Sequence, residues 1–198
     1  GAWADCRWGS RLLALGEEVG LDRRALVRAA AAAVRGEVDA VLGVGAASPV
    51  VALVDRWCDG QTGPDEVDAA RRSALAREAM TMDNDRASAR RALVRLLDGC
   101  AHDPGVHRGA PAAACEEAAD AAMFAAVLAA RATEPPAPAV PAGAMLAARR
   151  AAMELAAGAN RARDEAGNRA RAEAGRRQAA IVRERLPLAA FLDAIGVL

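Results

Sequence analysis

Residues 48–80 read SPVVALVDRWCDGQTGPDEVDAARRSALAREAM and predict two consecutive helices separated by a tight turn. Ser48 and Pro49 are typical of a helix start, where Ser48 acts as the N-cap and the fixed φ of proline suits the first turn. Gly60 ends the first helix, and Pro64 begins the second, followed by two acidic residues that complement its positive end. Because apolar residues recur every three or four positions in both segments, the stretch indicates an all-α fold.

The same signals extend in both directions along the chain. They predict further helices at about 8–19, 22–35, 84–98 and 111–132, each bounded by glycine, proline or an Asp/Asn cap. Alanine is abundant throughout, and it has the highest intrinsic helix propensity while allowing helices to approach closely. No segment alternates apolar and polar residues as a strand does. We therefore expect a multi-helix bundle or helical array.

Composition narrows the class of protein. The 198 residues suffice for one domain, or for one domain with an appendage. The 26 basic residues, all of them arginine, balance 26 acidic ones, and this balance disfavours nucleic acid as a partner. The four cysteines are too widely spaced for a disulfide scaffold, so we expect reduced thiols in a cytoplasmic protein. The longest apolar run, residues 121–130, is about half a membrane span, so no membrane segment is expected.

A proline-rich segment divides the chain. Residues 133–143 read TEPPAPAVPAG, and four prolines in eleven residues favour an extended linker. We expect a helical bundle over residues 1–132 and, over residues 144–198, a long basic helix followed by a short amphipathic tail. The long helix should run from about 144 to 186. Residues 144–198 carry 10 arginines and 6 acidic residues, a net charge of +4, whereas residues 1–143 carry the remaining 16 and 20, a net charge of −4.

A tandem repeat lies in the middle of this long helix. Residues 160–167 read NRARDEAG and residues 168–175 read NRARAEAG. The favoured interpretation is a solvated helix held by weak Arg–Glu pairs, with possible interruptions at Gly158, Gly167 and Gly175. The alternative is close packing on another helix through the glycines and an alanine stripe at 162, 166, 170 and 174. The candidate partner-binding residues are Arg161, Arg163, Arg169, Arg171, Arg176 and Arg177.

One segment resembles a metal site. Cys100, His102, His107 and Cys115 supply two thiols and two imidazoles within 16 residues, a suitable ligand set for zinc. Their spacing is not a familiar zinc pattern, because the ligands do not form two close pairs. The other interpretation is a polar surface loop beside one incidental and one buried cysteine. No catalytic residue set is recognisable.

Three segments carry a resemblance to a known family. The first is the early helix that begins near Cys6, together with the Arg- and Ala-rich helix that follows it. The second is residues 55–76, DRWCDGQTGPDEVDAARRSALA, and the third is residues 176–187, RRQAAIVRERLP. Together they resemble Ala-rich helical bacterial immunity proteins, similar to the immunity protein 5 family. The proline-rich linker and the tandem repeat depart from that pattern. The resemblance implies a protein that binds another protein, such as a toxin, and carries over no catalytic residues.

The leading hypothesis is therefore a non-enzymatic protein-binding module of a bacterial cell, either antitoxin-like or an adaptor. Its partner would be a toxin or a signalling protein, and no cofactor is expected. A second hypothesis is a zinc-binding helical enzyme, or a zinc-stabilised domain, that uses Cys100, His102, His107 and Cys115. A third is a structural homo-oligomer that assembles through the helix at 144–186.

Overall fold

The computed structural model describes residues 2–101, 109–134 and 146–196. Over these ranges the chain forms α-helices and no strands, so the predicted all-α fold is confirmed. The helices are α1 (Ala2–Asp5), α2 (Gly9–Glu18), α3 (Arg23–Leu42), α4 (Ser48–Cys58), α5 (Pro64–Ala79), α6 (Asn84–Cys100), α7 (Ala110–Ala132), α8 (Leu146–Arg185) and α9 (Leu188–Ala194).

Local sequence signals set most of the helix ends. The side chain of Asp22 caps α3 by accepting a hydrogen bond of 3.0 Å from the backbone N–H of Ala25. Proline lies in the first turn of α4, α5 and α7, where its missing N–H is not needed. Gly60 follows α4 with a φ of +72°, a conformation that favours glycine. One detail differs from expectation: Ala47 is the N-cap of α4, and Ser48 is already its first helical residue.

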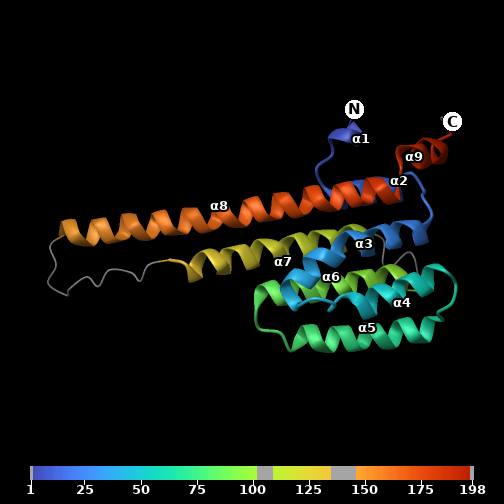
Figure 1. The fold of residues 1–198 in the computed structure, drawn as a ribbon, viewed down its shortest axis with the longest axis horizontal. Coiled ribbons are helices and arrows are strands. Elements are labelled where there is room, and N and C mark those ends of the chain that lie inside the picture. Colours follow the sequence, from blue (N-terminus) through green and yellow to red (C-terminus); the bar gives the residue numbers. More distant parts are fainter. Residues whose placement is uncertain (1, 102–108, 135–145, 197–198) are drawn as a thin grey trace.

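Helix α7 lies at the centre of the packing and contacts α2, α3, α6 and α8. Figure 1 shows α8 along one side of α7 and α3, with α4, α5 and α6 on the other side. The core is rich in small side chains, because Ala30 of α3 and Ala114 and Ala118 of α7 are fully buried. Larger residues such as Leu12 and Leu96 fill the remaining space. Alanine therefore sets the close spacing of these helices.

Helix α8 is continuous over 40 residues, so the expected interruptions at its glycines do not occur. Its second half packs on α2, α3 and α7, and Gly167 and Gly175 are buried there. A Cβ added to Gly167 would lie 2.8 Å from a methyl carbon of Val127, and one added to Gly175 would lie 2.5 Å from the Trp8 ring. The solvated interpretation is therefore wrong for this half of the helix. Because a glycine lacks a Cβ, it lets the neighbouring element approach the α8 backbone.

The two ends of the described chain meet beside the C-terminal end of α8 (Figure 1). The rings of Trp3 and Phe191 pack with their centroids 4.1 Å apart. The guanidinium of Arg183 donates hydrogen bonds to the backbone carbonyls of Trp3 and Ala4, at 3.2 and 3.1 Å, and to that of Cys6. The ring contact joins α1 to α9, and the Arg183 hydrogen bonds join α8 to the N-terminal segment. The expected linker falls almost entirely outside the described residues, apart from Thr133, the C-cap of α7, and Glu134.

Candidate functional site

A pocket of about 400 Å³ lies between the end of α3 and helices α4, α5 and α6. It exists because α5 packs against α6 and has Val67, near its start, as its one buried residue. The small side chains of Ala70 and Ala74 then leave space between α5 and α4. We call this space the α4–α5 pocket. It is lined by Leu42, Ala46, Pro49, Val50, Leu53, Ala70, Ser73, Ala74, Arg77, Arg86, Arg90 and Leu93.

Three guanidinium groups reach the pocket from α5 and α6. The Nη2 of Arg77 donates to Ser73 Oγ at 2.9 Å, and the Nη1 of Arg90 donates to the Arg77 carbonyl and the Thr81 hydroxyl. Arg86 has no hydrogen bond or ion pair with any part of the chain that the structure describes. No Asp or Glu occurs among the described residues that line the pocket. The pocket is therefore positively charged although the whole chain is neutral.

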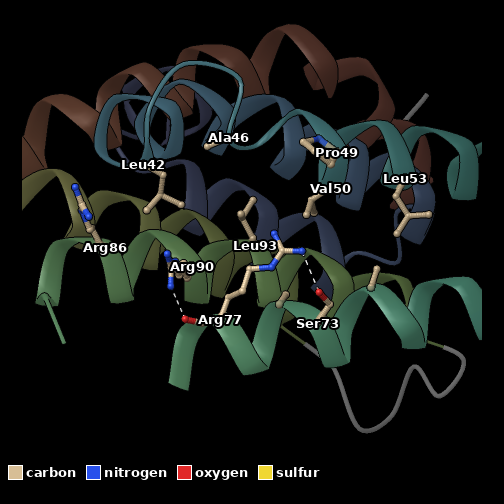
Figure 2. Close-up of a pocket in the computed structure, with 12 residues that line it drawn as sticks. Leu42, Ala46, Pro49, Val50, Leu53, Ser73, Arg77, Arg86, Arg90 and Leu93 are labelled. Carbon is tan, nitrogen blue, oxygen red and sulfur yellow. Dashed lines mark hydrogen bonds between the residues drawn. The ribbon is translucent and has the colours of Figure 1, made fainter. Parts of the chain in front are cut away.

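The opposite side of the pocket is apolar. Figure 2 shows Pro49, Val50 and Leu53 of α4 facing the space across from the arginines, with Leu93 of α6 between them. Leu53 and Leu93 are nearly buried, so they form the floor of the pocket and not its rim. The site thus presents a hydrophobic surface next to unbalanced positive charge. Such an arrangement suits a ligand with an apolar body and an anionic group.

This site was not predicted from the sequence, because its residues are spread over four helices. One signal was nevertheless visible. Arg86 and Arg90 lie four residues apart, which places two like charges on one helical face, a spacing that destabilises an isolated helix. The neighbouring Arg91 instead pairs with Glu117 at 2.9 Å. Asp83 and Asp85 precede Arg86 in the sequence, but neither is among the described residues that line the pocket. The like-charged pair at this spacing is therefore a partial sequence indicator of an anion site.

The proposed zinc ligands are described only in part. Cys100 lies at the end of α6 and Cys115 in α7, and both are buried. Burial raises the pKa of each thiol to about 12, so neither is a reactive thiolate at neutral pH. His102 and His107 lie outside the described residues. Elsewhere in the described chain, no three metal-ligating side chains cluster together. The zinc site stays a prediction.

The six candidate arginines of α8 fall into two groups. Three make ion pairs within the chain: Arg163 with Glu134 at 2.6 Å, Arg171 with Asp120 at 2.7 Å, and Arg177 with Glu37 at 2.8 Å. The other three, Arg161, Arg169 and Arg176, are exposed. They alternate with exposed acidic residues such as Glu165 and Glu173, so this outer face of α8 carries mixed charge.

The first part of α8 differs from the rest of the helix. Residues 146–162, here called the α8 arm, precede the Arg163–Glu134 ion pair and extend past the end of α7 (Figure 1). None of these residues is buried against the described chain. The arm nevertheless carries large apolar side chains, and Leu146, Met153 and Leu155 are 81%, 73% and 63% exposed. Leu146 and Met153 lie seven residues apart and therefore on one face.

Comparisons with protein families, with curated proteins and with solved structures find no match for this chain. The resemblance to immunity proteins therefore stays a prediction from the sequence. None of the helices in the described ranges combines the length and the apolar content needed to cross a bilayer.

Proposed function

We propose that the chain is a non-enzymatic protein-binding module and that the α8 arm is its main binding element. The observation that carries this proposal is the exposure of large apolar side chains on the arm, whereas the second half of the same helix is packed. Exposed apolar residues grouped on one surface are typical of interaction sites. Leu146 and Met153, with Ala157 four residues on, follow the i, i+7, i+11 spacing of a helix that binds in a groove.

The charges of the arm indicate the chemistry of its partner. Arg149, Arg150 and Arg161 are basic and Glu154 is acidic, which gives residues 146–162 a net charge of +2. A matching partner would offer an apolar groove with acidic residues at its edge, because complementary charge favours association and correct register. The resemblance to immunity proteins suggests that such a partner is a toxin, which the bound arm would neutralise. A signalling protein with the same groove would fit the adaptor version of this proposal.

The test compares the proteins that co-purify with the chain from its own cell. The variant Leu146→Asp/Met153→Asp should lose the specific partner at least tenfold relative to the wild type, measured by quantitative mass spectrometry. Its melting temperature should stay unchanged, because both positions are exposed. The control Met82→Asp changes a side chain that is 93% exposed and lies outside the arm, so it should retain the partner.

Two results would contradict the proposal. If the arm variant and the control retain the same partners in equal amounts, the arm is not the binding element. If the recovered partner is a second copy of this chain, the homo-oligomer hypothesis explains the exposed face instead. Native mass spectrometry of the purified protein distinguishes that case, because its mass would be twice that of one 20.4 kDa chain.

A further inference from the structure

We propose that the α4–α5 pocket binds a single-chain amphipathic anion, with a carboxylate or phosphate head group on the arginines and an apolar body against α4. This site is separate from the α8 arm and goes beyond the proposed protein-binding function. Three features of the pocket support this ligand: its charge, its apolar wall and its size.

The positive charge of the pocket lining favours an anionic ligand. Arg77, Arg86 and Arg90 all line one pocket, and no carboxylate among the described lining residues offsets them. Elsewhere this chain places acids beside such arginines: Arg71 and Arg95 both approach the buried Asp98, at 2.5 and 3.4 Å. Three guanidiniums that line one pocket with no acid among its described lining residues repel one another, and a bound anion relieves that repulsion. A guanidinium also matches the planar geometry of a carboxylate or phosphate.

The unused N–H donors of these arginines also indicate an anionic ligand. Each guanidinium carries five N–H donors. Arg77 and Arg90 use some of theirs on Ser73, Thr81 and the end of α5, whereas Arg86 uses none on the described chain. Arg86 is therefore the group best able to bind a head group directly. Arg90 mainly holds the end of α5 in place beside it.

The apolar wall of the pocket favours a ligand with an apolar body. The residues that α4 contributes to the lining are all apolar, and Leu42 of α3 and Leu93 of α6 extend this surface. In Figure 2 Leu53 lies at the far end of the pocket from Arg86, so a ligand with its anionic head at Arg86 would direct its apolar body toward Leu53. A small inorganic anion would leave this wall uncovered. An uncharged lipid would leave the guanidiniums without a partner.

The volume of the pocket limits the size of the ligand. A volume of about 400 Å³ lies within the range of small-molecule sites. At about 30 Å³ for each non-hydrogen atom, the share of one water molecule in the liquid, the pocket holds roughly a dozen such atoms. A saturated acid of ten carbons has about that number. A protein helix is about 10 Å across, so it could insert only one or two side chains here.

The experiment titrates the full chain with decanoate by isothermal calorimetry. We expect one site per chain, filled equally well by decyl phosphate and at least tenfold more weakly by decanol, which lacks the charge. Each added methylene carries about 0.8 kcal/mol of transfer free energy, so affinity should rise roughly fourfold per carbon from hexanoate to decanoate and then level off. Equal binding of decanol, or no chain-length dependence, overturns the proposal.

Variants locate the site on the protein. Arg86→Glu should weaken decanoate binding at least tenfold while leaving the melting temperature unchanged, because Arg86 bonds to no described residue. Ala74→Phe should also abolish binding, since the new ring fills the pocket. The matched control Arg72→Glu alters an exposed α5 arginine outside the lining and should bind as the wild type does. If Arg86→Glu binds decanoate normally, the proposal fails. It also fails if decanoate does not bind to the wild type and an acidic peptide binds at the pocket instead.

Discussion

Replacing Gly175 by alanine tests how closely α8 approaches the N-terminal segment. A Cβ at this position would lie 2.5 Å from Cε3 of the Trp8 ring and 3.3 Å from the carbonyl oxygen of Arg7. Side chains do not approach so closely, so the ring or the helix must shift, and overpacking of this kind costs about 1–3 kcal/mol. The higher helix propensity of alanine returns about 1 kcal/mol. The net loss in the free energy of unfolding is therefore about 0–2 kcal/mol.

Gly158 provides the matched control on the same helix. Apart from the nearby backbone of α8 itself, no described atom lies within 4 Å of a Cβ added there, so Gly158→Ala should gain about 1 kcal/mol from propensity alone. The two variants should thus differ by about 1–3 kcal/mol, which for a chain of this size separates their melting temperatures by about 2–12 °C. Circular dichroism during heating and in urea measures this difference. Equal stabilisation by both substitutions would refute the close packing of α8 on Trp8.

Three further predictions concern charge, thiols and metal. Arg177→Ala should lower the free energy of unfolding by roughly 2–3 kcal/mol in urea titrations, because it leaves the buried Glu37 carboxylate without its two N–H donors. The control Arg176→Ala should lower it by under about 0.5 kcal/mol. The raised thiol pKa values stabilise the folded state below the ordinary value of 9.0, so stability should fall as the pH rises from about 9 to about 12, and less steeply in the Cys100→Ala/Cys115→Ala variant. Elemental analysis of protein purified without chelators should find less than about 0.1 zinc per chain, and an equimolar amount would establish the zinc hypothesis instead.

Helix identity was predictable because it depends on neighbouring residues. The cap at Asp22, the prolines at the starts of α4 and α5, and Gly60 each act within one or two turns of their own position. The packing of helix α8 was harder to predict, because a glycine in a helix has two opposite effects. It weakens an isolated helix, yet it also allows close contact with another element. Only the position of Trp8 and Val127 in space shows that Gly175 and Gly167 serve contact.

The pocket was less predictable than the fold, for a related reason. Its arginines come from α5 and α6, while its apolar wall comes from α3 and α4, so no single window of sequence contains it. The exposure of the α8 arm was also hidden. Leu146 and Met153 form an apolar stripe that could equally have faced the bundle, and which side it faces depends on where α7 ends. The position of the arm relative to α7 depends on contacts between residues far apart in the sequence, so it does not appear in a local pattern.

The tandem repeat also determines how far the arm extends. Each copy places a buried glycine at its last position and an ion-paired arginine at its fourth, so each copy is one unit of attachment to the body. Eight residues lengthen a helix by about 12 Å and rotate it by roughly 80°. Inserting another copy before Asn160 would leave every downstream contact in place and would carry the arm one such step outward. One duplication of a 24-nucleotide unit in the gene would therefore change the reach of the arm and its orientation together without redesigning the body that supports it. A second duplication would also need a longer segment than the eleven residues 135–145, because these span at most about 40 Å.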